Sequence, residues 1–296
     1  MSYETDAVKP GNLKEDDIII AIMGPTGCGK SQIIDLLTGQ PGRRAKDTLQ
    51  SVTKDVTAFR VLNHETHGSH IVLVDTPGFD DVDRSDKEIL EMISAWLVKT
   101  YKRKLVLAGV IYLHRISDLR MSEAPHRNLR MFGELSGNKS AKKVVLATTM
   151  WDKVCDIAEG EKRESALKEK YWNVMLHHGA VVERFLNTPE SAWAVINKLV
   201  ERERNKSALL LQEELLDLGK RLNETNAGKA LYLDLQILVA KQNKTIQPDV
   251  EKPQETEKDM HALLQSADKI LREAESLRIP LRRKVARFIG NVIGKK

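Results

Sequence analysis

The chain has 296 residues, of which 41% are apolar and 30% are charged, with a formal net charge of +5. This length and composition predict a globular protein with one sizeable core and an extension, or two modest domains. The apolar runs are shorter than the ~20 residues of a membrane-spanning helix, the N-terminus lacks an apolar signal core, and two cysteines cannot form a disulfide framework. We therefore expect a cytoplasmic protein.

Residues 1–16 are polar and acidic, and we expect them to form a flexible N-terminus. From residue 17 to residue 200, short apolar runs alternate with helical patterns, which is typical of a doubly wound, mostly parallel α/β sheet. The predicted strands are Ile18–Met23, Thr57–Leu62, Ile71–Asp75, Leu105–Leu113, Val144–Thr149 and Val181–Leu186. The predicted helices are Gln32–Leu37, Lys87–Lys99, Arg127–Leu135 and Ser191–Val200. Two strand-like runs around a polar loop at Gly68 predict one antiparallel edge hairpin.

Residues 201–296 lose the strand pattern and predict a helical extension. Leucines recur at helical spacing on both sides of a break at "NAGK", namely at Leu211, Leu215, Leu218, Leu222, Leu231, Leu235 and Leu238. A polar linker is predicted near residues 243–258, and a further apolar stripe follows between Met260 and Ala274. Residues 280–296 predict a basic amphipathic helix. Its apolar face can pack on protein, or the helix can lie on an anionic membrane surface.

The stretch "MGPTGCGKS" stands between a strand-like run and a helical pattern. It contains G-x-x-x-x-G-K-[ST] in the context that this pattern requires. Its glycines let backbone N–H groups surround a phosphate, and the following helix adds its positive end. We expect Lys30 to reach the β- and γ-phosphates and the Ser31 hydroxyl to bind Mg²⁺. The predicted nucleotide contacts here are Gly24, Pro25, Thr26, Gly27, Cys28, Gly29, Lys30, Ser31 and Gln32.

The stretch "VLVDTPGFDD" predicts the element that senses the γ-phosphate. Asp75 ends an apolar strand and is expected to contact the metal ion, while the backbone N–H of Gly78 is expected to contact the γ-phosphate. This D-x-x-G pattern, placed on a strand after a phosphate loop, indicates a GTPase of the TRAFAC class. In "QSVTKDVTAF", Thr53 is our first candidate and Ser51 our second for the hydroxyl that closes over Mg²⁺.

Recognition of the base is predicted in "VVLATTMWDKV", where GTPases carry [NT]-K-x-D. Thr149 and Asp152 match this pattern, and Asp152 can accept hydrogen bonds from guanine N1–H and N2–H₂. Met150 replaces the usual lysine, so its apolar side chain would have to pack on the base. Asn187 can approach the guanine edge or cap the helix at "TPESAW". Trp151 is interpreted as a packing residue.

Together these segments resemble the AIG1-type (GIMAP) and septin-like GTPases, most closely fungal G-domain proteins of that group. The resemblance covers residues 18–200 and rests on "GPTGCGKSQIIDLLTG", "SVTKDV", "VDTPGFDD", "AGVIYLHRISDLRM", "RNLRMFGELSG" and "VVLATTMWDKV". It implies a Ras-like P-loop fold, GTP or GDP with Mg²⁺ as ligands, and homodimers that pair face to face across their nucleotides. In such a pair a residue of the partner can complete the site. Arg115 is our candidate for this guanidinium, which would stabilise the transferring phosphate, and a surface arginine in a loop is the alternative.

Phe79 stands where fast Ras-type GTPases carry the glutamine that orients the attacking water. Because a benzyl side chain cannot orient water, we expect slow hydrolysis and a switch that depends on its nucleotide state. An assembly scaffold with negligible hydrolysis and an ATP-using P-loop protein are the alternatives. Nucleic-acid binding is not expected, since no fold signature for it is present. The predicted catalytic set is Lys30, Thr53, Gly78 and Arg115, and the predicted metal ligands are Ser31, Thr53 and Asp75.

Overall fold

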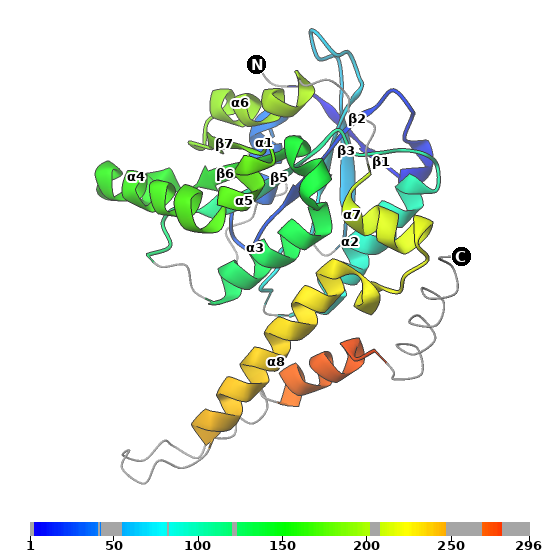
Figure 1. Cartoon of the computed structure of the whole chain (residues 1–296). Helices are drawn as coiled ribbons and strands as arrows, with labels where there is room; N and C mark the ends of the chain where they lie inside the picture. The colour runs from blue at the N-terminus through cyan, green and yellow to red at the C-terminus, as the bar shows by residue number, and fades with distance from the viewer. Residues whose placement is uncertain are drawn as a thin grey trace.

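A computed structural model describes residues 3–40, 42, 55–81, 83–119, 123–201, 208–246 and 268–279. A seven-stranded sheet lies at its centre, in the order β1-β3-β4-β2-β5-β6-β7 (Figure 1). The strands are β1 (Thr5–Val8), β2 (Ile18–Met23), β3 (Thr57–Val61), β4 (Ile71–Asp75), β5 (Gly109–Arg115), β6 (Val144–Thr149) and β7 (Val181–Arg184). The predicted Ras-like α/β fold is confirmed.

The central strands are buried on both faces, which explains their continuous apolar sequences. All residues of β2, "IIIAIM", are buried, as are those of β4 and β6. Strand β2 pairs in parallel with β4 on one side and with β5 on the other, so the loops after these strands meet at one edge of the sheet. This edge is where ligands bind in open α/β sheets.

Helices cover both faces of the sheet. On one face lie α1 (Lys30–Leu37) and α6 (Pro189–Val200), and on the other lie α2 (Asp86–Tyr101) and α3 (Glu123–Ser136). Between β6 and β7 the chain forms α4 (Ile157–Ala166), a π-helical turn (Leu167–Tyr171) and α5 (Asn173–His177), which the sequence patterns did not predict. Short 3₁₀ turns occupy Pro10–Asn12, Asn138–Lys143 and Trp151–Lys153.

Two predictions about the sheet edge are wrong. Residues 5–8 form β1, which pairs antiparallel with β3, so this part of residues 1–16 is an ordered strand and not a flexible terminus. As predicted, β3 runs antiparallel to β4, but β1 covers its other side, so β3 is an inner strand. The physical reason is that β1 supplies backbone partners to the edge that the hairpin would otherwise expose.

The extension after residue 208 packs on the face formed by α2 and α3. It contains α7 (Leu210–Gln212), a π-helical turn (Glu213–Asp217), a 3₁₀ turn (Leu222–Glu224), α8 (Asn226–Ile246) and a helix over 268–277. Its buried side chains belong to the same hydrophobic cluster as those of α2 and α3: Leu209, Leu211, Ala227, Leu231, Leu235, Ala274 and Leu277. A carboxylate oxygen of Glu273 also accepts a hydrogen bond of 2.9 Å from the Lys87 backbone N–H, next to the start of α2.

The leucine stripe of the extension does not form one helix. Leu218 is 61% exposed, and the neighbouring Gly219 has a φ of +57°, a left-handed conformation that ends the helical path. The "NAGK" stretch, predicted to be a break, instead begins α8, which runs through the first residues of the predicted linker near 243–258. The predicted basic helix at 280–296 lies outside the described residues.

Two leucines on α8 test whether the extension contributes to the core. Leu235 is 3% exposed and Leu233 is 53% exposed. Leu235→Ala should lower the free energy of unfolding by about 2–5 kcal/mol, the usual cost of emptying a buried leucine site. Leu233→Ala is the matched control and should stay within about 0.5 kcal/mol of the wild type. Urea unfolding measures both, and equal effects would contradict the packing described above.

Candidate nucleotide-binding site

The phosphate loop joins β2 to α1 in a conformation that depends on glycine. Gly24, Gly27 and Gly29 have φ values of +143°, +76° and +95°, which L side chains rarely adopt. At Gly24 the space is also closed, because an added Cβ would lie 2.5 Å from the backbone oxygen of Leu113. Gly29 immediately precedes the first turn of α1, so the loop ends at the positive end of this helix.

The Lys30 ammonium lies inside this loop. Its Nζ donates hydrogen bonds of 3.1 Å to the Gly24 carbonyl and 2.7 Å to the Pro25 carbonyl, and the residue is only 7% exposed. The loop thus holds a cation at its centre, where a phosphate would be bound. The neighbouring Cys28 is fully buried, and burial raises the pKa of its thiol. This favours the interpretation of Cys28 as a small packing residue over that of a reactive thiol.

The predicted metal ligands on α1 and β4 lie together. The Ser31 hydroxyl donates a hydrogen bond of 3.0 Å to Oδ2 of Asp75. Asp75 is the last residue of β4 and is only 2% exposed. A hydroxyl and a carboxylate are hard oxygen ligands of the kind that Mg²⁺ prefers. The donor set therefore fits the predicted cation. Thr53, the third predicted ligand, and its alternative Ser51 lie outside the described residues.

The segment after Asp75 packs directly on the phosphate loop. The Thr26 N–H donates to the Phe79 carbonyl at 2.8 Å, and the Phe79 N–H donates to the Gly24 carbonyl at 3.3 Å. A Cβ added at Gly78 would lie 2.4 Å from Thr26 Oγ1 and 2.7 Å from Lys30 Nζ. Only glycine therefore allows this backbone to approach the lysine. The Phe79 side chain is fully buried and faces the core.

Arg115 ends β5 and reaches the phosphate loop of its own chain. Its Nη1 donates to the Thr26 carbonyl at 3.4 Å, and an added Cβ at Gly27 would lie 3.4 Å from the same nitrogen. An ion pair with Asp118, with a distance of 3.2 Å from Nε, orients the guanidinium. The sequence-based hypothesis had Arg115 act across a dimer, on the nucleotide of a partner subunit. In this structure its guanidinium contacts the phosphate loop of its own chain.

The predicted base-recognition turn follows β6 and is joined to the phosphate loop. Thr149 Oγ1 donates a hydrogen bond of 2.9 Å to the Cys28 carbonyl, so Thr149 connects the two loops. Met150 has a left-handed φ of 60°, and its Cε lies 3.8 Å from the position of a Cβ on Gly29. Its side chain therefore lies against the phosphate loop. Asp152 follows in a 3₁₀ turn with a side chain that is 45% exposed.

Asn187 contacts Gln32 of α1 and does not cap α6. Thr188 is the cap of that helix, because its side chain accepts a hydrogen bond from the Ser191 N–H. Asn187 instead has a φ of 59°, and its Oδ1 accepts a hydrogen bond of 3.1 Å from Nε2 of Gln32. The contact brings two predicted nucleotide contacts together, one after β7 and one on α1. Sequence patterns gave no indication of this pairing.

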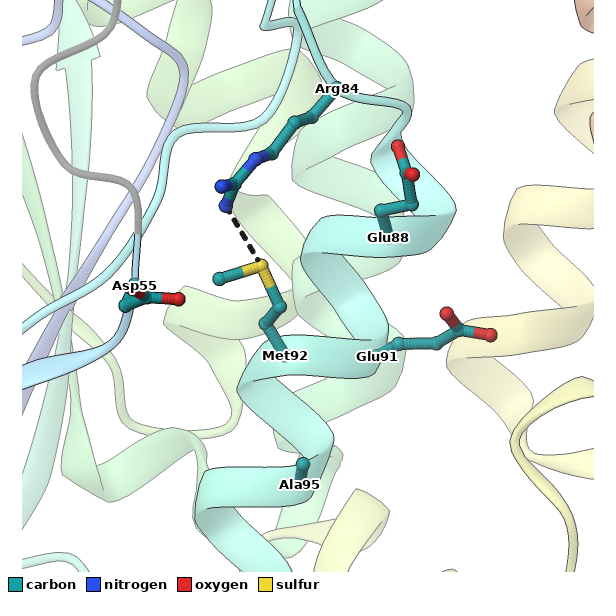
Figure 2. A pocket seen from close by; sticks show the side chains of 6 residues that line it. All are labelled: Asp55, Arg84, Glu88, Glu91, Met92 and Ala95. Atoms are coloured by element: carbon teal, nitrogen blue, oxygen red, sulfur yellow. Dashed lines mark hydrogen bonds between the residues drawn. The ribbon is translucent and has the colours of Figure 1, made fainter.

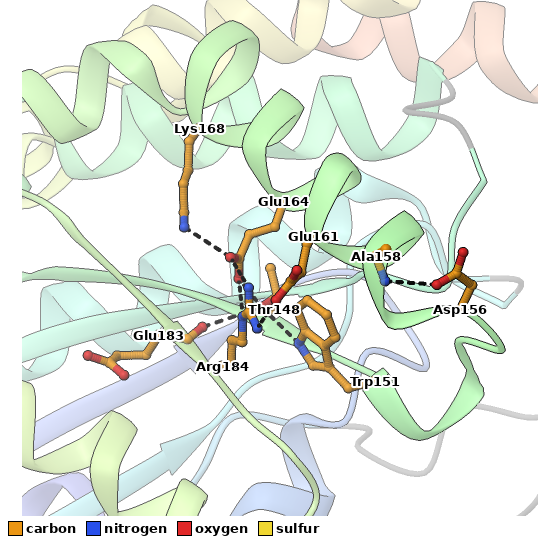
Figure 3. Close-up of polar contacts among 9 residues, drawn as sticks. All are labelled: Thr148, Trp151, Asp156, Ala158, Glu161, Glu164, Lys168, Glu183 and Arg184. Carbon is orange, nitrogen blue, oxygen red and sulfur yellow. Dashed lines mark hydrogen bonds and ion pairs between the residues drawn. The ribbon is translucent and has the colours of Figure 1, made fainter.

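Sequence reasoning also missed Glu164 and Arg184, which lie beside the predicted base-recognition turn (Figure 3). Arg184 ends β7 and Glu164 lies on α4, and they form a hydrogen-bonded ion pair of 2.8 Å beside Trp151. Their separation along the chain follows no motif spacing, and Arg184 lies inside the predicted strand Val181–Leu186, so no sequence pattern indicated either residue.

A separate pocket lies beside α2 (Figure 2). It is lined by Asp55, Arg84, Glu88, Glu91, Met92 and Ala95, and none of these belongs to the phosphate loop. Arg84 Nη1 lies 3.1 Å from Met92 Sδ within it. This pocket is therefore not the predicted nucleotide site.

No helix among the described residues combines the length and apolarity needed to span a membrane.

Comparisons with known proteins agree with this geometry. Residues 19–148 match the family model described as 50S ribosome-binding GTPase, and this segment contains the phosphate loop and Asp75. Guanylate-binding protein 5 of Mus musculus is 27% identical over 110 residues, which are 34% of this chain and 19% of that protein. The chain thus spans about a fifth of the length of this relative.

Solved structures of similar fold include chloroplast translocon GTPases. One, reported for the translocon components atToc33 and psToc159, has a TM-score of 0.50 and 15% identity, covering 65% of this chain and 87% of that chain. Toc33 from Arabidopsis thaliana with GDP and Mg²⁺ has a TM-score of 0.48 and 16% identity, covering 64% and 86%. The first of these likenesses shows the fold. The family match and the guanylate-binding relative support the assignment of residues 19–148 to a TRAFAC-type GTPase domain.

Proposed function

We propose that this chain is a guanine-nucleotide-binding switch of the AIG1-type or septin-like kind that hydrolyses GTP slowly to GDP and phosphate. The observation that carries the proposal is the convergence of Lys30, the Ser31 and Asp75 pair, and Gly78 around one loop. This arrangement supplies a cation, two oxygen ligands and a backbone N–H to one triphosphate. These are the kinds of group that phosphoryl-transfer sites use.

The roles of the residues follow from their positions. Lys30 and the loop amides would bind the β- and γ-phosphates, while Ser31, Asp75 and Thr53 would hold Mg²⁺. When bound, the cation would neutralise charge that develops on the phosphate oxygens. Phe79 lies in the core, so its side chain orients no water. The intrinsic rate should therefore be low. Arg115 would add a second positive charge beside that of Lys30.

A homodimer through the G domain is supported by exposed apolar side chains near the nucleotide loops. Leu119, Ile157 and Leu186 are 80%, 64% and 51% exposed, and they lie in the segments that follow β5, β6 and β7. Exposed apolar side chains that follow parallel strands at the same edge of a sheet are candidates for a protein interface. We keep a second hypothesis for residues 280–296: this basic segment would bind either an anionic membrane surface or a partner helix.

Lys30→Ala tests the phosphate grip. The variant should bind GTP about a hundredfold more weakly or worse, because each hydrogen bond to a charged group contributes about 1.5–3 kcal/mol. Fluorescent GTP and ATP analogues measure the affinity and also decide between guanine and adenine. Lys162→Ala removes a lysine whose side chain is 78% exposed and serves as the control. Undiminished binding by Lys30→Ala would remove the phosphate-loop assignment.

Asp152→Asn tests base recognition. The amide can donate to the 2-oxygen of xanthine, whereas it loses the acceptor for guanine N2–H₂. The ratio of GTP to xanthosine triphosphate affinity should fall by a factor on the order of a hundred. Lys153→Ala is the control, because Lys153 Nζ lies 3.8 Å from Asp152 and its loss isolates any effect of that ion pair. An unchanged ratio in Asp152→Asn would show that another group reads the base.

Single-turnover hydrolysis at rising protein concentration separates the switch from a non-hydrolysing scaffold. A dimer-assisted switch should show a rate that rises with concentration, and Arg115→Ala should slow it at least about tenfold, since arginines at transferring phosphates contribute large factors. A flat rate near zero at every concentration would instead support the scaffold. Nucleotide affinity measured in parallel shows whether Arg115→Ala acts on binding or on turnover.

A further inference from the structure

Trp151 directly precedes Asp152, and its indole is contacted both at the ring N–H and on the ring face (Figure 3). Its Nε1 donates a hydrogen bond of 3.0 Å to Thr148 Oγ1, which in turn donates one of 3.1 Å to Glu164 Oε1. The Arg184 guanidinium carbon lies 4.3 Å from the centre of the Trp151 ring, within the range of a cation–π contact. The indole therefore has both a fixed position and a fixed orientation.

Glu164 is the centre of this arrangement. It is 4% exposed, and its carboxylate accepts hydrogen bonds from Arg184 Nε at 3.1 Å, Arg184 Nη2 at 2.8 Å and Lys168 Nζ at 2.9 Å. Burial alone raises the pKa of Glu164, but the hydrogen bonds from Arg184 and Lys168 outweigh burial and lower it. The carboxylate is thus ionised and paired on both oxygens, as a buried charge must be.

A third contact comes from the backbone of α4. Gly160 packs so closely on the indole that an added Cβ would lie 2.9 Å from Trp151 Cζ3. Helix α4 therefore contributes both the carboxylate that anchors the cluster and a surface on which the ring lies. Strand β7 contributes the arginine, so two separate elements fix one side chain of the turn.

The turn that this cluster supports has a strained residue. Met150 lies in the left-handed region at φ 60° and ψ 36°, where a long non-glycine side chain costs of order 1–3 kcal/mol. Such a conformation persists only where the surroundings fix it. The next residue is Trp151, and the Val154 N–H closes the turn by donating to the Trp151 carbonyl at 3.2 Å. The clamped indole is therefore positioned to hold the turn in place.

We propose that Glu164, Arg184 and Trp151 are positioning residues for base specificity, holding the turn so that Asp152 meets guanine. The inference rests on the proposed guanine binding. Glu164 and Arg184 contact Thr148 and Trp151, whereas Thr149 is the residue that bonds to the phosphate loop. Base recognition and phosphate binding would therefore depend on different contacts.

The test is the ratio of GTP to ATP affinity in Trp151→Phe, Glu164→Gln and Arg184→Lys. Trp151→Phe keeps an aromatic ring and loses the N–H, and Arg184→Lys keeps the charge and loses the planar fork. Glu183→Gln is the matched control, because Glu183 is the neighbouring residue of β7 and pairs at 3.1 Å with Lys198 on α6. The ratio should fall about tenfold or more in the three variants, as misplaced binding groups cost one to two orders of magnitude.

Hydrogen exchange of residues 149–154 provides a readout without nucleotide. Exchange there should rise in Trp151→Phe and Arg184→Lys, and stay unchanged in Glu183→Gln. If Glu164→Gln fails to fold, these two milder variants still decide the question. A GTP to ATP ratio within about twofold of the control would overturn the proposal. Equal weakening of GTP and ATP would overturn it too, since the cluster would then support the whole site.

The wild type separates this proposal from the function on which it rests. A wild type that binds GTP no better than ATP would refute guanine recognition itself, and the positioning role with it. A wild type that prefers GTP, with variants that keep the preference, would refute only the positioning role.

Discussion

The candidate site depends on the position of one ammonium group, that of Lys30, inside the phosphate loop. Lys30 is buried, and its Nζ is held by the carbonyls of Gly24 and Pro25. A buried cation is costly unless it is paired, so the loop has to offer either its own carbonyls or a bound anion. Gly78 lies against the same nitrogen, and Ser31 turns its hydroxyl toward Asp75. The residues predicted to bind phosphate, to bind Mg²⁺ and to sense the γ-phosphate therefore lie around the positive charge of Lys30.

The sheet explains how residues far apart in the sequence reach that charge. Strands β2, β4, β5 and β6 run in parallel, so their carboxyl ends lie at the same edge of the sheet. The phosphate loop follows β2 there, and Asp75, Arg115 and Thr149 are the last residues of β4, β5 and β6. The C-terminal extension lies on the α2 and α3 face. Its Glu273 accepts a hydrogen bond from the Lys87 N–H at the start of α2. The extension thus adds to the core of the G domain.

The parts of the site that could be predicted from the sequence are those fixed by local chemistry. Glycines at positive φ values, a lysine at a helix start and an aspartate at a strand end have positions that follow from the local sequence. Lys30 lies inside the phosphate loop, Asp75 contacts Ser31, and Gly78 packs against Lys30. Strand β1 was missed because "TDAV" is short and polar, and only its pairing with β3 makes it a strand. The contact between Gln32 and Asn187, and the Glu164 pair with Arg184, depend on tertiary packing, which no spacing in the sequence encodes.

The central claim is that this chain holds a guanine nucleotide through the loop around Lys30. The most direct measurement is the identity of the nucleotide that copurifies with the full chain, released by denaturation and separated by chromatography. The account predicts GDP or GTP in near-stoichiometric amount, or a nucleotide-free protein that takes up GTP when Mg²⁺ is added. Recovery of an adenine nucleotide, or a folded protein that takes up no GTP, would contradict it.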